Sequence, residues 1–171
     1  MRLRPNRKVI QSGTVSYTFG GIGVVAVPVA VAGVNDLSRV VERLLGYTYS
    51  ANDYYDVSLE LVSTTQLIVH IRANAAGTMY VDYDIVASDG KVQRGYASMT
   101  SALVANATIN AVDVTMAKVF NNGLYLVSTG ATLGGYKPNN GMKLVDPTPL
   151  QISRSAFNTN NETRHYFAVE S

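Results

Sequence analysis

The 171-residue chain contains no cysteine. Disulfide bonds and cysteine-ligated zinc sites are therefore excluded as sources of stability. The most apolar stretch, IGVVAVPVAVAGV at 22–34, carries a proline and is shorter than the ~20 apolar residues that a membrane-spanning helix needs. A polar stretch separates it from the basic start of the chain, so we expect no secretion signal. Stability must come from packing, from a neighbouring module or from other subunits, and no membrane partner is expected.

Histidine is scarce as well, with only His70 and His165. A metal site or a catalytic dyad would need further ligands or catalytic residues close to these histidines, and the sequence contains no motif for them. The glycines of FGGIG (19–23) lack the context of a phosphate loop and predict a turn between strands. Asp82 and Asp84 would share a strand face, but the fixed ligand spacing of a calcium loop is missing, which makes calcium the less favoured alternative. We expect no enzyme, no cofactor and no bound metal.

The sequence does contain an internal repeat. IQSGTVSYT (10–18) returns as VQRGYASMT (92–100) at an offset of 82. The stretch 61–88 aligns without a gap on the last part of the chain, 144–171, at an offset of 83. Because the matches keep their order and lie mostly at strand-like positions, the sequence predicts a tandem duplication.

The middle of each repeat corresponds less closely. Val34 falls on Val112 and, after one inserted residue, Arg39 falls on Lys118. The repeats meet near Ser88-Asp89-Gly90. We therefore predict three parts: a basic N-terminal arm (1–8), a first β-sandwich module (9–88) and a second β-sandwich module (89–171).

Alternating apolar and polar residues favour strands throughout the chain. The pattern is clear in VSLELV (57–62), QLIVHIR (66–72) and TMYVDYDIV (78–86). Asn121-Asn122-Gly123 predicts a hairpin turn, and the Asn-Gly at 140–141 predicts another. Short strands separated by turns indicate an all-β fold with a small antiparallel sandwich, or a small barrel, in each module.

One segment, 35–47, could instead be a helix. Asn35 would be its cap and Gly46 its stop. Its partner in the second repeat has the pattern of a strand, and homologous modules should agree. We therefore predict strands in both places.

The order of these signals resembles a known group of proteins. Each module begins with Gln-x-Gly, continues with Val-Asp/Asn and a basic residue, and ends with an aromatic residue and a valine. The matching residues are Gln11, Gly13, Val34, Asn35, Arg39, Leu61, Val62, Tyr83 and Val86 in the first module, and Gln93, Gly95, Val112, Asp113, Lys118, Leu144, Val145, Tyr166 and Val169 in the second.

This pattern is similar to the small β-sandwich modules of tailed-bacteriophage virion proteins, such as head-decoration and tail-fibre-like modules. The resemblance spans nearly the whole chain, and Asn35 stands where the pattern usually has an acid. It implies a virion structural role after assembly in the bacterial cytoplasm, and an oligomeric, often trimeric, state. It transfers no catalytic residues.

Charge is divided unevenly along the chain. Residues 1–8 carry four basic residues and no acidic one. Residues 9–88 carry three basic and seven acidic residues, and residues 89–171 carry seven basic and five acidic residues. Complementary charges speed encounter and fix register. We expect the arm to dock on an acidic surface, either of a neighbouring copy or of a capsid protein. Its basic residues are Arg2, Arg4, Arg7 and Lys8.

Tyrosines gather between 47 and 55, a region expected to be a loop. Tyrosine offers contact area and a hydroxyl group at low entropic cost, so such a loop suits a subunit interface or a host glycan. Packing at a strand edge is the alternative. The tyrosines concerned are Tyr47, Tyr49, Tyr54 and Tyr55.

The favoured function is a non-enzymatic virion protein that decorates the capsid and is anchored by its arm. The alternatives are a tail-fibre or head-fibre component that binds the host surface and a carbohydrate-binding module outside any virus. Binding of nucleic acid is disfavoured, because four charges without an aromatic stacking face support only weak, salt-sensitive contact.

Overall fold

The computed structural model describes residues 8–51, 55–99, 104–112, 116–126, 141–144, 149–153 and 162–170. Its first half contains β1 (Val9–Phe19), β2 (Gly23–Ala30), the short 3₁₀ helix η1 (Leu37–Arg39), β3 (Val40–Tyr49), β4 (Tyr55–Ser63), β5 (Gln66–Ala73) and β6 (Gly77–Ala87). Its second half contains β7 (Lys91–Met99), β8 (Val104–Thr108), β9 (Ala117–Leu126), β10 (Gly141–Leu144), β11 (Pro149–Ser153) and β12 (Glu162–Glu170).

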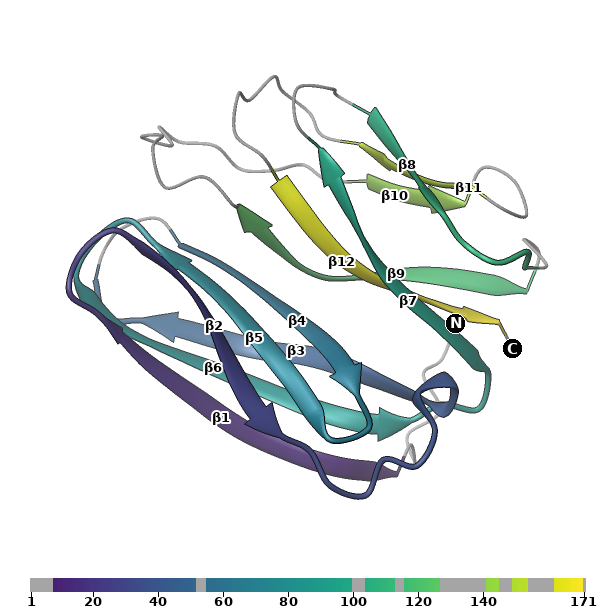
Figure 1. Ribbon diagram of the computed structural model, residues 1–171, viewed down its shortest axis with the longest axis horizontal. Coiled ribbons are helices and arrows are strands. Elements are labelled where there is room, and N and C mark those ends of the chain that lie inside the picture. The colour runs from purple at the N-terminus through teal and green to yellow at the C-terminus, as the bar shows by residue number, and fades with distance from the viewer. Residues whose placement is uncertain are drawn as a thin grey trace.

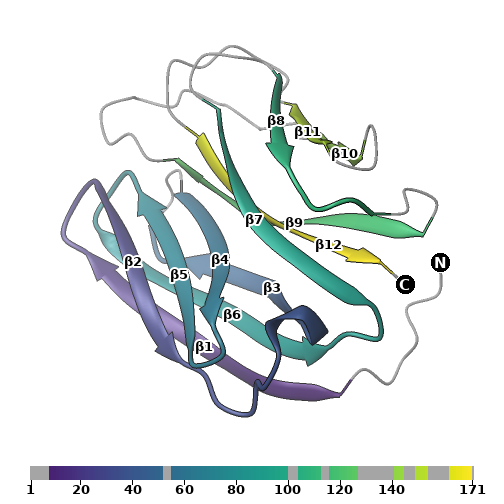
Figure 2. The same cartoon turned by 45° about the vertical axis from the view of Figure 1, so that its right-hand side comes forward.

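These strands form three antiparallel sheets. Their orders are β1-β6-β3, β10-β11-β8 and β2-β5-β4-β9-β12-β7. Figures 1 and 2 show the six strands of each half gathered on their own side of the molecule, with the longest sheet running through both halves. The predicted all-β class is confirmed, and none of the three sheets closes into a barrel.

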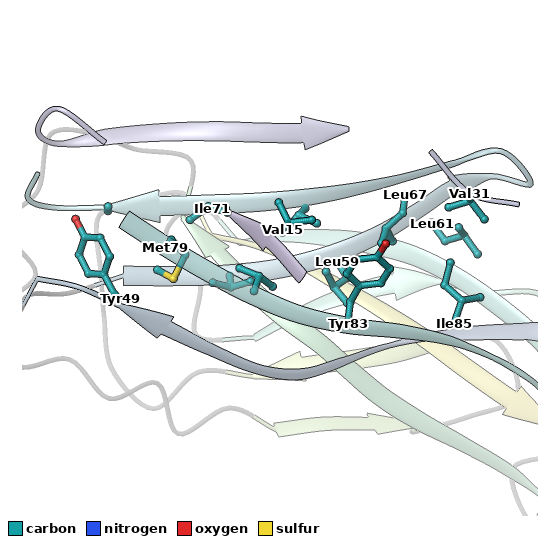
Figure 3. Close-up of a cluster of buried hydrophobic side chains, with 14 of the residues drawn as sticks. Val15, Val31, Tyr49, Leu59, Leu61, Leu67, Ile71, Met79, Tyr83 and Ile85 are labelled. Carbon is teal, nitrogen blue, oxygen red and sulfur yellow. The ribbon is translucent and has the colours of Figure 1, made fainter. Parts of the chain in front are cut away.

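One apolar cluster lies between the two sheets of the first half (Figure 3). Alternate residues of β4, β5 and β6 supply its centre, as the period of two along a strand requires. Each of these side chains is at most 4% exposed: Val57, Leu59, Leu61, Leu67, Val69, Ile71, Met79, Val81, Tyr83 and Ile85. Alternation had predicted this face for all three segments.

Three local predictions have different outcomes. The turn expected at FGGIG lies between β1 and β2, and the strand predicted for 35–47 is present as β3, preceded by η1. The hairpin turn predicted at Asn121-Asn122-Gly123 is wrong, because β9 continues through these residues. Asn121 lies opposite Tyr166 and Leu124 lies opposite Arg164 of β12, with a register shift between the two pairs. Pairing before and after the shift keeps the strand continuous, and the local turn preference is reduced to an irregularity within β9. On its other edge, Gly123 lies opposite Ser58 of β4.

The sheets of the two halves have corresponding strand orders. The order β1-β6-β3 corresponds to β7-β12-β9, and β2-β5-β4 corresponds to β8-β11-β10. The registers correspond too, since Gly13 lies opposite Tyr83 and Gly95 lies opposite Tyr166.

The register also corrects one detail of the sequence alignment. Lys118 lies opposite Val169, and Val41 lies opposite Val86. At the offset of 83 that aligns Val86 with Val169, this register places Lys118 on Val41 rather than on Arg39.

A glycine faces a tyrosine ring at the same place in both halves. A Cβ atom added to Gly13 would lie 2.9 Å from Oη of Tyr83, and one added to Gly95 would lie 2.7 Å from Oη of Tyr166. Both tyrosines are buried. Glycine weakens a strand in general, so its presence here is explained by the close approach of the ring.

We predict that Gly13→Ala and Gly95→Ala each lower the free energy of unfolding by about 2 kcal/mol, because the new methyl group overpacks a buried ring. Gly46→Ala is the matched control on β3, since nothing lies within 4 Å of its added Cβ atom. It should be neutral or stabilising by ~0.5 kcal/mol. Urea unfolding of the three variants measures the difference, and equal midpoints would contradict the explanation.

Candidate interaction site at the junction of the two halves

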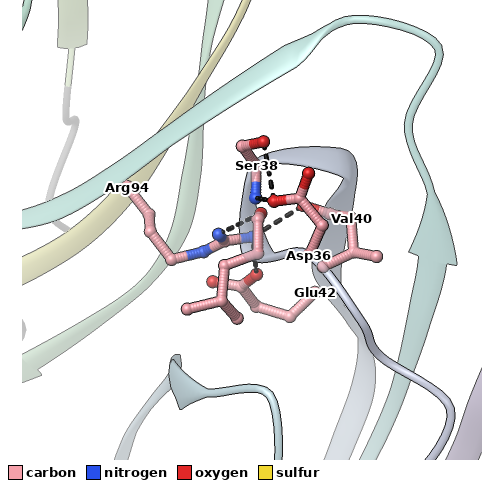
Figure 4. Close-up of polar contacts among 6 residues, drawn as sticks. Asp36, Ser38, Val40, Glu42 and Arg94 are labelled. Carbon is pink, nitrogen blue, oxygen red and sulfur yellow. Dashed lines mark hydrogen bonds and ion pairs between the residues drawn. The ribbon is translucent and has the colours of Figure 1, made fainter.

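Arg94 on β7 joins the two halves (Figure 4). Its guanidinium group donates to the carbonyl oxygen of Leu37 on η1, to the carbonyl oxygen of Val40 at 2.6 Å and to Oε2 of Glu42 at 3.2 Å. The planar fork of arginine suits several acceptors at once. One side chain from the second half thus fixes the start of η1 and the start of β3.

Glu42 is the buried partner in this contact. Only 2% of the residue is exposed, and this burial raises the pKa of its carboxyl group, while the positive charge of Arg94 acts in the opposite direction. A buried carboxylate without a paired cation is costly. The ion pair therefore needs both halves in contact.

Asp36 holds the short helix that supplies the Leu37 carbonyl. Its Oδ1 accepts hydrogen bonds from the backbone nitrogen of Ser38 at 2.8 Å and from Ser38 Oγ at 2.7 Å. These bonds lower the pKa of the Asp36 carboxyl group. The arrangement is a capping contact at the start of η1.

A small apolar cluster lies at the same junction. Val41 and Val86 come from the first half, and Val92 and Val169 come from the second. The turn between β6 and β7 includes Gly90, where a Cβ atom would clash with the backbone of Glu170. The junction is thus close-packed as well as hydrogen-bonded.

A cleft of about 330 Å³ adjoins this junction. Its lining includes Glu42, Leu61, Arg94, Tyr96 and Tyr166. Its charged side chains all have partners: Arg94 and Glu42 bond to each other, and Glu60, which also lines the cleft, is paired with His70. In the part of the chain that the structure describes, no three His, Cys, Asp or Glu residues are grouped to hold a metal ion.

The predicted tyrosine loop is not a loop. Tyr47 and Tyr49 belong to β3, and Tyr55 begins β4. The ring of Tyr55 packs edge-to-face against both, with centroid distances of 5.4 and 5.5 Å. Tyr49 is only 9% exposed and its hydroxyl group donates to the Ala75 carbonyl, whereas Tyr47 is 45% exposed. Burial at the end of the core explains why most of this aromatic surface is used for packing.

Tyr54 and three basic residues of the arm, Arg2, Arg4 and Arg7, lie outside the described residues. Lys8 is exposed, and its carbonyl oxygen accepts a hydrogen bond from the Ala87 nitrogen at 2.9 Å. This bond continues the pairing of β1 with β6 to the edge of the arm.

The other candidate polar residues have structural partners. His70 Nε2 lies 2.8 Å from Oε2 of Glu60. Asp82 accepts a hydrogen bond from Thr14 at 2.6 Å. Asp84 is paired with Arg43 through both carboxylate oxygens, and this bond raises the pKa of the arginine.

Sequence reasoning missed the contact between Arg94 and Glu42. One signal was available: at the offset of 82, Arg94 falls on Ser12, so the charge has no counterpart in the first repeat. A charged residue that breaks a repeat is a candidate for a contact made by one module only.

Comparison with known proteins finds no matching family model, no similar curated protein and no similar solved structure. The described residues form no helix long and apolar enough to cross a membrane.

We predict that Arg94→Met lowers the free energy of unfolding by about 3 kcal/mol, because it leaves the buried Glu42 without its cation. Lys91→Met is the matched control, since it removes an exposed charge from the same strand. It should change stability by less than ~0.5 kcal/mol. Urea unfolding at neutral pH makes the comparison, and similar midpoints for the two variants would contradict the assigned role.

The raised pKa of Glu42 predicts a pH dependence. A folded-state pKa above the unfolded value means that the folded protein holds the proton more tightly. The stability gained from this proton is complete below the ordinary value, about 4.5, and is lost as pH rises through the folded pKa. The Glu42→Gln variant has no carboxyl group to titrate at this position, so it should not show this loss of stability.

The stability of the wild type relative to Glu42→Gln should therefore fall as pH rises from 4 towards neutrality. Urea unfolding of both proteins across this range isolates the carboxyl group, because all other titrating groups are shared. A constant difference, or a change of opposite sign, would contradict the prediction.

Proposed function

We propose that the chain is a non-enzymatic structural protein of a tailed-bacteriophage particle, and that it consists of two copies of one β-sandwich module. The observation that carries the proposal is the agreement of strand order and register between the halves. It supports the repeat on which the resemblance to virion modules depends. The favoured role is capsid decoration, anchored by the basic arm of residues 1–8.

The glutamines of the Gln-x-Gly signature support the duplication further. Gln11 donates to the Ala30 carbonyl at 3.0 Å and accepts from the Ala32 nitrogen at 3.0 Å. Gln93 donates to the Asn110 carbonyl at 3.2 Å and accepts from the Asn110 nitrogen at 2.9 Å. Each side chain thus holds the backbone that follows the second strand of its own half.

The sandwich proposed for the first module is supported by its core. The buried side chains of β1, β3 and β6 meet those of β4 and β5 in one cluster. Two facing sheets with a shared apolar interior are the arrangement expected of a sandwich. In the second half, the same strand order supports the same architecture.

The distribution of polar groups supports a structural role. The charged residues at the junction bond across the two halves, and the glutamines bond to the backbone. These contacts make the modules rigid and hold them together. A decoration protein needs a rigid body and an attachment point. The basic arm of residues 1–8 would supply the attachment point.

A host-binding role in a fibre is the second candidate. It is favoured by tyrosines that remain accessible on the described surface, since tyrosine suits glycan recognition. The accessible tyrosines are Tyr17, Tyr47, Tyr80 and Tyr96.

Localisation in purified particles tests the proposal. Cryo-electron microscopy should find copies spread over the icosahedral shell, with residues 1–8 touching capsid subunits. A chain that lacks residues 1–8 should bind particles more weakly, and the loss should be largest at low salt because the docking is electrostatic. Copies confined to the tail would favour the fibre role, and absence from the particle would reject a virion function.

A further inference from the structure

The two halves are joined by an edge contact between sheets. Ser58 of β4 pairs antiparallel with Gly123 of β9, which connects β2-β5-β4 with β9-β12-β7. In strand order, β9 occupies in the second half the position of β3 in the first. The joint therefore connects the β4 edge of one half to the β3-like edge of the next.

The strand edges that correspond to these two remain unpaired in the part of the chain that the structure describes. β3 ends the sheet β1-β6-β3, and β10, the counterpart of β4, ends the sheet β10-β11-β8. No strand among the described residues pairs with either outer edge. A chain built from two copies of one module would thus carry one unused edge of each kind, one on each half.

Arg94 of the second half already holds the start of β3 through the Val40 carbonyl. The later part of the β3 edge is exposed and apolar where a partner strand would lie. Leu45 is 57% exposed and Tyr47 is 45% exposed. Gly46 lies between them and has nothing within 4 Å of an added Cβ atom. Exposed apolar edge strands are templates for pairing with another chain.

The edge of β2 provides a contrast. This strand ends the long sheet and is also apolar, but it contains Pro28. Proline cannot donate a backbone hydrogen bond and protects an edge against pairing. β3 contains no proline, so it lacks this protection.

Register identifies the residues that would meet. Leu61 pairs with Leu67, and Leu144 pairs with Leu150, so β10 follows β4 at an offset of 83. At this offset Ser58 corresponds to Gly141.

The residue on the other edge follows from β3 and β9. Tyr47 pairs with Val81 and Leu124 pairs with Arg164, which are equivalent positions in β6 and β12. The residue before each is a glycine, so Gly46 corresponds to Gly123. The pair Ser58–Gly123 within the chain thus corresponds to Gly141–Gly46 between two chains.

We propose that copies of this chain associate head to tail, with the β10 edge of one copy pairing antiparallel with the β3 edge of the next and Gly141 opposite Gly46. Such a contact joins two different surfaces, so it produces a ring if the rotation closes and a filament if it does not. The inference rests on the proposed duplication, but not on the proposed location in a virion.

Disulfide trapping tests the contact, and the absence of native cysteine makes every trapped bond informative. Directly opposite residues of paired strands lie within the Cα separation that a disulfide bridges. Gly46→Cys and Gly141→Cys are made separately and mixed, then oxidised briefly. The mixture should give covalent dimers, each variant alone should stay monomeric on a denaturing gel, and the double variant should give a ladder of multimers or a closed ring.

The double variant Ser58→Cys/Gly123→Cys is the control within one chain, and its disulfide should form without any dimer. If that control forms but the mixture gives no dimer, the contact between copies is rejected while the duplication stands. If the control also fails, the joint between the halves is rejected, and with it the template for the proposal. Dimers from one variant alone would mean a symmetric contact and would also reject it.

A second measurement does not require cysteine. Leu45→Lys adds a charge at the β3 edge and should shift the sedimentation of the protein from oligomer to monomer. Ile22→Lys is the matched control, because Ile22 is equally accessible but lies in the turn before β2. A monomeric wild type at all concentrations, or equal shifts for both variants, would overturn head-to-tail association.

Discussion

The arrangement of the molecule depends on one partly buried guanidinium group. Arg94 lies against two backbone carbonyl groups and one buried carboxylate of the other half, so its hydrogen bonds exist only when the halves are in contact. The adjoining valine cluster is small, and β4 and β9 share a single paired position. Without this contact the long sheet would have little to hold its two parts in line.

Within each half, a different constraint sets the packing. A tyrosine on the last strand lies over a glycine on the first, and a glutamine two residues before this glycine fixes the backbone after the second strand. The signature Gln-x-Gly therefore combines two requirements: a side-chain amide that replaces missing backbone partners, and space for a ring. Neither requirement involves a ligand.

The sequence was sufficient to predict the strands of the core, because they follow from local periodicity. Val57, Leu59 and Leu61 alternate, and alternation determines which face is buried. It was not sufficient at Asn121-Asn122-Gly123, where β9 continues through a strong turn signal because β12 pairs with it before and after the register shift. The contact between the halves could not be predicted from the sequence either, because Arg94 and Glu42 are far apart in sequence and belong to no motif. The loop expected for Tyr47, Tyr49 and Tyr55 was wrong for a related reason, since composition does not distinguish a loop from strands at the end of a core.

The proposed duplication has a physical consequence for assembly. Two copies of a module with two different sheet edges, joined once, would leave one edge of each kind unpaired. Under the proposal of head-to-tail association, the contact between β4 and β9 is available again, in the same register, between molecules. The charged contact made by Arg94 does not repeat, because Ser12 occupies its position in the first half. The joint within a chain should thus be stronger than the joint between chains, which allows the protein to fold as one unit before it assembles.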